Sequence, residues 1–410
     1  MDFDSSNANA LRKAFHGLYS DMQHAYHHCR SQHLKPAVKT VNTWRNLPLP
    51  ADMRKQLAQV QTGLPESTYF PKDIQHHILN EQSTAITYRF SVYDRKVVLH
   101  FVEFNKRESD LNMNKMLAHA KRVCALIHLV SMHASRSTCS AELNIFIYMT
   151  KFKKQFPTEK GQPLDAEHAN TGMSYHCAKN NDVLVYRKEE WFKVLIHELF
   201  HALGLSFIES DMPPEVEAAM QRMLQRMYAI SHPVRIYETY CEMWARILNI
   251  IFDCFSEDDT THADAMHMNV FIDCVFDGLH ANARFAQKQC AKLLRYMDLS
   301  HAVISHPTKE NRALVAKKYR ENTNVFAYYV LTCVLLHSPD AFMVWCYKNN
   351  PFTRDKPRTN VLQFRTIPSN FNGFMEMMHR CKQRCPDLDS ACNDADVLGS
   401  SMRMTVKDRF

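Results

Sequence analysis

The sequence predicts an α+β fold, in which a small mixed sheet and its helices are followed by a large region that is almost entirely helical. Two observations carry this prediction. The segments between residues 86 and 205 alternate in the order strand, strand, helix, strand, strand, helix, whereas apolar residues after position 213 recur mainly at helical spacing. Glycine is also scarce, at 8 of 410 residues, so helices should outnumber glycine-bearing turns.

The individual elements follow from these patterns. Runs rich in β-branched and aromatic residues predict four strands, at 86–93, 97–104, 143–148 and 183–186. The first two should be joined by a turn at Asp94-Arg95-Lys96. Apolar residues at three- and four-residue steps predict the helices, at about 111–134, 189–205, 213–230, 234–254, 265–297, 308–319, 323–337, 339–348 and 370–383.

Changes in pattern divide the chain into four parts. Residues 1–80 should form a helical N-terminal arm, with a helix at 8–34 followed by five prolines. Residues 81–210 hold the sheet and the helices beside it, residues 211–385 form the helical part, and residues 386–410 form a loose polar tail. The sequence leaves open whether the arm inhibits the rest of the protein.

Composition excludes several classes of protein. Hydrophobic residues make up 46% and charged residues 23%, which excludes a disordered or collagen-like chain. The net charge of +7 is not concentrated in one tract, so charge alone does not argue for nucleic-acid binding, which we expect to be absent. No signal peptide begins the sequence, and the longest apolar run, 325–336, is too short to span a membrane. Thirteen cysteines are too sparse for a disulfide scaffold and odd in number, so we expect a reducing, intracellular location in the cytoplasm.

The strongest chemical signal is His197-Glu198-Leu199-Phe200-His201, within an expected helix. On a helix, His197 and His201 project from one face, one turn apart, so both imidazoles can reach one zinc ion. Glu198 then lies beside the metal and can take a proton from zinc-bound water. From Val194 to Leu205 the only charged residues are those of the motif, as expected for a buried catalytic helix. These residues predict a Zn²⁺ site.

Two histidines leave this site one protein ligand short of the usual three. A third histidine six residues after His201 is excluded, because that position is Phe207. A glutamate on a later helix is the other common source, and the segment 236–246 supplies Glu238 and Glu242. These two share a helix face, so one can bind zinc while the other holds a ligand histidine from behind.

Taken together, His-Glu-x-x-His at 197–201 and Glu-x-x-x-Glu at 238–242 resemble the gluzincin metallopeptidases. The resemblance covers about residues 85–250 and implies a zincin-like catalytic core that hydrolyses peptide bonds. The implied roles are zinc ligands for His197, His201 and Glu238, general base for Glu198, and support of a ligand histidine for Glu242. The peptide or protein substrate would lie extended along an edge strand, for which we expect 183–186.

The resemblance also implies a donor to the developing oxyanion, which is commonly a tyrosine or histidine in this family. We expect Tyr328 to be this residue; the further candidates are Tyr237, Tyr240, Tyr329 and His232. The segments 187–193 and 324–330 are also similar to metallopeptidase-like proteins of large double-stranded DNA viruses. That similarity implies a place in the host cytoplasm or the virion, with virion or host proteins as partners.

Two other functions remain open at this point. One is a catalytically silent, zincin-like structural or virion-associated protein, and the other is a nucleic-acid-associated factor, which rests on the net charge alone. The intact Glu198 favours an enzyme, because a scaffold needs no base between its histidines. A second, structural zinc site is a weaker option, since irregular spacing separates its candidate ligands His379, Cys381, Cys385 and Cys392.

Overall fold

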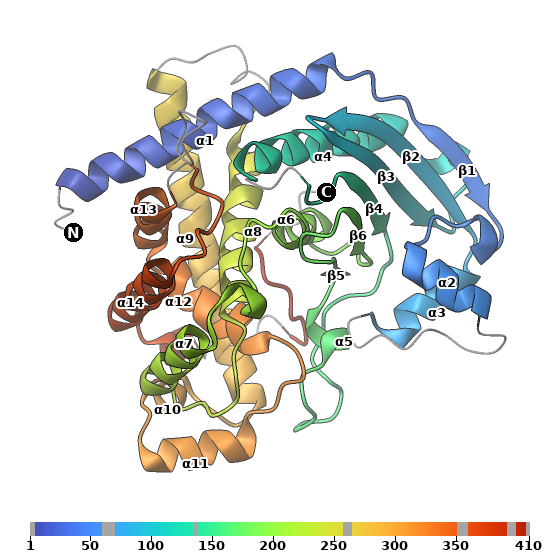
Figure 1. Ribbon diagram of the computed structural model, residues 1–410. Coiled ribbons are helices and arrows are strands. Elements are labelled where there is room, and N and C mark those ends of the chain that lie inside the picture. Colours follow the sequence, from blue (N-terminus) through green and yellow to red (C-terminus); the bar gives the residue numbers. More distant parts are fainter. Residues whose placement is uncertain are drawn as a thin grey trace.

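A six-stranded mixed sheet forms one side of the protein, and the helices of the second half of the chain form the other (Figure 1). The computed structural model describes residues 5–59, 70–134, 138–256, 265–350, 360–391 and 399–406. Within these ranges the strands precede most of the helices along the chain, which confirms the α+β class.

The strands lie side by side in the order β1-β2-β3-β4-β6-β5. Their bounds are β1 (Ala37–Val41), β2 (Ser83–Val92), β3 (Arg95–Phe104), β4 (Glu142–Tyr148), β5 (Gly172–Met173) and β6 (Asn180–Val185). Strands β3, β4 and β6 are parallel, and the other neighbours are antiparallel. The four predicted strands are confirmed. The sequence does not indicate β1 and β5, because β1 is largely exposed and β5 has only two residues.

The helices of the first half are α1 (Ser5–Ser31), α2 (Ala51–Gln59), α3 (Lys72–Asn80), α4 (Met113–His133), α5 (Ala166–Ala169) and α6 (Trp191–Ala202). Those of the second half are α7 (Pro214–Met227), α8 (Ile236–Cys254), α9 (Ala265–Tyr296), α10 (His301–Ser305), α11 (Lys309–Lys318), α12 (Thr332–Leu336), α13 (Pro339–Asn349) and α14 (Pro368–Arg384). Single 3₁₀ turns occur at η1 (Trp44–Asn46), η2 (Glu108–Asp110), η3 (Glu209–Asp211) and η6 (Leu388–Ala391).

One predicted helix, 323–337, differs from the structure. Its first part is a π-helix, η5 (Phe326–Leu331), which leads directly into α12. Such wider turns occur mostly within helices and often at functional sites. No single helix in the described part of the chain is both long and apolar enough to cross a membrane; one bent pair, 326–336 with 339–349, qualifies by length and composition alone.

Alternating side chains of the strands supply two cores, one on each face of the sheet. In β4, Ile145 and Ile147 pack into the core that includes α4 and α6, whereas Phe146 and Tyr148 pack into the core that includes α2 and α3. This is the two-residue period of a strand. Helix α6 therefore lies buried against the sheet, and this places the predicted zinc motif between the sheet and the helical half.

The predicted N-terminal arm packs into the rest of the molecule. Helix α1 lies along α4, and its buried Phe15 and Tyr19 belong to the same core as α4 and α6 (Figure 1). Asp21 of α1 lies 3.1 Å from Nε2 of the buried His133 at the end of α4. Strand β1 adds an edge to the sheet beside β2.

The hairpin between β2 and β3 is tighter than the predicted turn at 94–96. Val92 pairs with Arg95, so the turn consists of Tyr93 and Asp94. Arg95 belongs to the strand because its buried guanidinium donates to the carbonyl oxygen of Cys139 at 3.2 Å. Arg95 could not form this hydrogen bond from a solvent-exposed turn.

Two pairs of cysteines are bonded, Cys139 with Cys177 and Cys254 with Cys274. Neither bond is expected from the sequence, whose sparse and odd-numbered cysteines favour a reducing location. The fold brings together residues that lie 38 and 20 positions apart, and no short sequence pattern links them. Eight other cysteines of the described residues form no disulfide bond.

The polar tail is less loose than its composition predicts. Met402 and Met404 are buried, and Ser401 forms a β-bridge with Gln155. The polar residues around the two methionines dominate the composition, but the apolar side chains decide where the segment docks.

Candidate metal centre

Two buried helices, α6 and α8, each carry a row of polar side chains at four-residue steps. The row on α6 is Lys193, His197 and His201, and the row on α8 is Glu238, Glu242 and Arg246. Four-residue steps keep each row on one helix face, and the ion pairs between them show that the two rows face each other. Burial of so many charged groups is costly unless they pair with one another or bind a metal ion.

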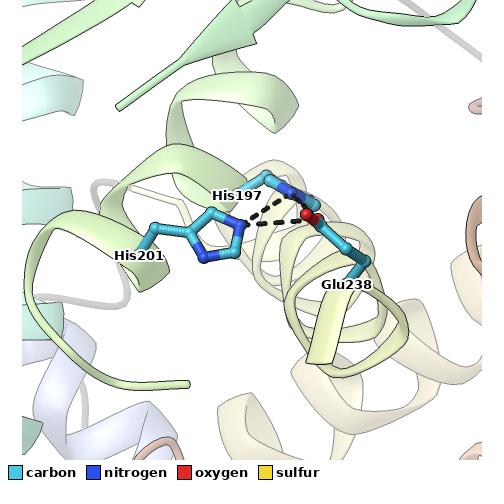
Figure 2. A group of neighbouring side chains, drawn as sticks. All are labelled: His197, His201 and Glu238. Carbon is cyan, nitrogen blue, oxygen red and sulfur yellow. Dashed lines mark hydrogen bonds and ion pairs between the residues drawn. The ribbon is translucent and has the colours of Figure 1, made fainter. Parts of the chain in front are cut away.

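Three atoms converge where these rows meet, as Figure 2 shows: Nε2 of His197, Nε2 of His201 and one carboxylate oxygen of Glu238. Oε2 of Glu238 lies 3.0 Å from Nε2 of His197 and 3.4 Å from Nε2 of His201, and the two nitrogens are 3.2 Å apart. Ligands bound tetrahedrally to zinc at 2.0–2.1 Å are about 3.3 Å apart. The triangle therefore has the size of three corners of a zinc site.

The contacts of His197 also favour a cation at this point. Nδ1 of His197 lies 3.3 Å from Oε2 of Glu242, so it can donate to this carboxylate and leave Nε2 as the ligand atom once a metal ion displaces the Nε2 proton. Burial opposes a charge on His197, but hydrogen bonds to Glu238 and Glu242 outweigh it and raise its pKa to about 10. A metal ion would compete with that proton.

The two glutamates of α8 differ in their electrostatic partners. Both oxygens of Glu242 lie 3.0 Å from Nζ of Lys193, and Nε of Arg246 donates to Oε1 at 2.9 Å. Burial works against ionisation of Glu242, yet these two cations hold its pKa well below the usual range. Across the described ranges, Glu238 forms no ion pair with a lysine or arginine. Glu238, whose charge no described lysine or arginine neutralises, is thus the carboxylate that points at the two Nε2 atoms.

Glu198 lies on α6 next to His197 and faces the first residues after β5. The hydroxyl of Ser174 donates to Oε2 of Glu198 at 2.8 Å. Burial raises the pKa of Glu198, while His197 and His201 act in the opposite sense. A carboxylate of raised pKa accepts a proton more readily near neutral pH, as a general base must.

Strand β5 corrects the predicted edge of the sheet. We expected 183–186 to be the edge, but β5 pairs with β6 at Leu184 and Val185 and covers it. The carbonyl of Thr171 accepts a hydrogen bond from the amide of Tyr186 at 2.9 Å. Because antiparallel residues alternate in direction, the backbone amide and carbonyl of the next residue, Gly172, point away from β6 toward the open side.

Gly172 lets β5 approach α6 closely. A Cβ atom at this position would lie 2.8 Å from the carbonyl oxygen of Leu184, 2.8 Å from Cγ1 of Val194 and 3.0 Å from Cγ of Glu198. Two of these three neighbours lie on α6, so a larger residue would push β5 away from the candidate base Glu198.

We expect Gly172→Ala to lower the free energy of unfolding by about 1–3 kcal/mol, because the added methyl group overpacks the space between β5 and α6. Gly17→Ala on α1 is the matched control, since a Cβ there meets nothing within 4 Å. The control should be neutral or stabilising by up to about 1 kcal/mol, because alanine favours helix. Guanidinium unfolding measures both changes. Equal values for the two variants would contradict the close approach.

Tyr328 and Asn324 complete the surroundings of Glu238. The Tyr328 hydroxyl donates to Oε2 at 3.1 Å, and Nδ2 of Asn324 donates to Oε1 at 3.1 Å. Burial, together with the charge of Glu238, raises the pKa of Tyr328 well above its usual value, so the hydroxyl stays protonated. Tyr328 lies in the π-helix η5, whose wider turn belongs to this site.

The other four predicted oxyanion donors contact groups other than the Glu238 carboxylate. Tyr240 donates to the carbonyl of Leu362 at 2.8 Å, Tyr329 donates to the carbonyl of Met402, and His232 pairs with Glu321 at 3.0 Å. The Tyr237 ring packs against His201, with 5.9 Å between ring centroids. Of the five candidates, the structure places only Tyr328 in hydrogen-bond contact with the converging carboxylate.

Sequence reasoning missed four residues that contact this site: Lys193, Arg246, Ser174 and Asn324. For two of them a signal exists. Lys193 lies four residues before His197, and Arg246 lies four residues after Glu242, so each extends the polar face of its helix. Ser174 lies in an irregular segment, where spacing carries no comparable information. Asn324 falls within the predicted helix 323–337, four residues before Tyr328, but in the structure it lies just before η5.

Two cavities adjoin the centre. One of about 50 Å³ is lined by His197, Glu198, Glu242, Tyr328 and Gly172 among others. The other has about 800 Å³ and lies between α7, the start of α8 and residues 319–324, and both Tyr237 and Asn324 line it. The larger one offers room for side chains of a ligand close to the converging atoms.

Another group, Asp165, Glu167 and His168, is close enough to surround an ion but is not suited to it. Nδ1 of His168 accepts the backbone N–H of Asp165 at 2.9 Å, so Nε2 carries the proton, which points toward Glu167.

The weaker option of a second zinc site is not supported by the described residues. His379, Cys381 and Cys385 do not converge there, and Cys392 lies outside the described residues. Within the described ranges, His197, His201 and Glu238 are therefore the group best arranged to hold a metal ion. No family model matches the chain, and neither a curated protein nor a solved structure does.

Proposed function

We propose that the protein is a zinc-dependent metallopeptidase of the gluzincin type with a zincin-like core. The observation that supports this most is the convergence of His197 Nε2, His201 Nε2 and Glu238 Oε2, with Glu198 on the same helix as the histidines. In this proposal the three converging residues bind Zn²⁺ and Glu242 orients His197. The intracellular location and the virion or host partners stay predictions.

The bound zinc would supply a Lewis acid that polarises the scissile carbonyl and acidifies a water molecule. Glu198 accepts a proton from the attacking water as the new C–O bond forms. It then delivers this proton to the amine nitrogen as the C–N bond breaks. Tyr328, which stays protonated, would turn its one O–H from Glu238 to donate a hydrogen bond to the oxygen that gains negative charge.

The open side of β5 is the proposed place of the substrate. An extended peptide can pair with the outward amide and carbonyl of Gly172, as an added strand does at a sheet edge. Gly172 and Ser174 flank this edge beside Glu198, so a peptide there passes the base. The cavity of about 800 Å³ beside Asn324 would accept side chains of such a peptide.

Metal analysis and a substrate search together test this function. Purified wild-type protein should carry about one zinc per chain. A library of peptides from a digested proteome, analysed by mass spectrometry, should show cleavage that a chelator abolishes and added zinc restores. Zinc without cleavage of any peptide would favour the catalytically silent alternative. Absence of zinc after supplementation would contradict the metal site itself.

Ser174→Ala should reduce the rate of peptide cleavage by about tenfold, because the hydrogen bond that orients the Glu198 carboxylate is lost. The zinc content should not change, since Ser174 contacts none of the three converging atoms. Ser109→Ala, at an exposed serine in η2, is a suitable control and should keep full activity. A normal rate in Ser174→Ala would show that Glu198 does not need this contact.

A further inference from the structure

The C-terminal segment, residues 399–406, binds along the molecule by its backbone. The amide of Phe156 donates to the carbonyl of Ser400 at 3.0 Å, and the amide of Met402 donates to the carbonyl of Lys154 at 2.9 Å. From helix α9, Gln289 donates to the carbonyl of Arg403 at 2.5 Å. Contacts from residues 154–156 and from α9 hold the backbone of this segment in place.

The segment is fixed to the start of α6 by Glu190. This residue is buried and adopts a left-handed conformation, with φ of 59°, just before the helix begins. Its Oε1 accepts the amide of Met404 at 2.9 Å and the amide of Thr405 at 2.5 Å. Lys154 forms a buried ion pair with the same carboxylate. Glu190 thus joins the segment to the helix that carries the histidines.

One side chain of the segment reaches the metal centre. Met404 is 3% exposed, and its sulfur lies 3.6 Å from Nζ of Lys193. It lines the cavity of about 50 Å³ together with His197 and Glu242. Contacts therefore run from Met404 to Lys193, from Lys193 to Glu242, and from Glu242 to Nδ1 of His197.

We propose that the C-terminal segment is a working part of the metal centre, in which Met404 keeps water from the Lys193–Glu242 ion pair and so holds His197 in its metal-binding orientation. Attraction between two charges weakens as the surrounding dielectric rises. Groups that orient a ligand histidine typically change metal affinity by about 10–100-fold when they are removed. Met404 is thus a positioning residue, and this inference rests on the proposed zinc site.

The zinc dissociation constants of full-length variants test the proposal, measured by competition with a chromophoric chelator. Met404→Ala should bind zinc about tenfold more weakly, because water enters beside Lys193. Met404→Leu should stay within about threefold of wild type, since it fills the same space. Met402→Ala is the matched control: Met402 is also buried in the segment but does not line the cavity, so its zinc affinity should stay within about threefold.

The two alanine variants should lose similar amounts of thermal stability, which separates positioning from general destabilisation. Wild-type zinc affinity in Met404→Ala would overturn this inference alone, and so would an equal loss of affinity in Met402→Ala. A wild-type chain that takes up no zinc would overturn the proposed function and this inference with it. If Met404→Ala does not fold, the smaller truncation Met404→Val replaces it, with an expected loss of about fivefold, beyond the threefold margin of the controls.

Discussion

Replacing Glu198 by glutamine is expected to slow peptide hydrolysis by about a thousandfold while the zinc content stays at the wild-type level. Glutamine has the same shape, but its amide cannot accept a proton from water. Glu198 is not one of the three converging residues, so metal binding should not depend on its charge. The Ser174 hydroxyl can still donate to the amide oxygen, and this keeps the side chain in place.

The measurement is kcat on a peptide cleaved by the wild type, at equal zinc occupancy. Glu103→Gln is the matched control, because Glu103 is also a buried glutamate but lies on β3 and pairs with Lys106. It should retain full activity. Hydrolysis at the wild-type rate by Glu198→Gln would show that another group accepts the proton.

Glu238→Ala and Glu242→Ala are expected to fail in different ways. Glu238→Ala removes one of three converging atoms, so zinc per chain should fall from about one to nearly zero after dialysis. Glu242→Ala keeps the three atoms but releases Nδ1 of His197, so zinc affinity should fall by about 10–100-fold.

In the metal-free proteins, the free energy of unfolding should fall more in Glu242→Ala than in Glu238→Ala. Glu242→Ala leaves Lys193 and Arg246 buried without their shared carboxylate, which should lower the free energy of unfolding by about 3–5 kcal/mol. Glu238→Ala strands no lysine or arginine and should cost less. Zinc analysis and guanidinium unfolding on the same preparations separate the two. If Glu238→Ala keeps one zinc per chain and Glu242→Ala loses it, then Glu242 is the ligand and Glu238 supports the histidine.

Local periodicity explains why much of the fold and the centre could be predicted. Residues 86–92 of strand β2 show a two-residue alternation in the sequence, and four-residue steps place His197 above His201 on one helix. The choice of Glu238 over Glu242 followed only from the resemblance to gluzincins. In the structure, charge supports the same choice, because Lys193 and Arg246 already balance Glu242.

The features that could not be predicted depend on contacts distant in sequence. Strand β5 has two residues, too few for any alternation to appear, and it exists because Gly172 fits against β6 and α6. The Cys139–Cys177 bond joins two loops 38 residues apart. The docking of Met404 depends on Glu190, which lies more than two hundred positions earlier.

The distance in sequence between Glu190 and the C-terminal segment affects the order in which this site assembles during synthesis. Thr405 follows Glu190 by 215 residues, so at ordinary rates of translation roughly 10–40 s pass between the synthesis of the two. During this interval both α6 and α8 can leave the ribosome, but the amides that bind Glu190 do not yet exist. His197 and His201 of α6 can thus pack against Glu238 and Glu242 of α8 before Met404 covers the Lys193–Glu242 pair. The arrangement is complete only after most of the chain has been synthesised.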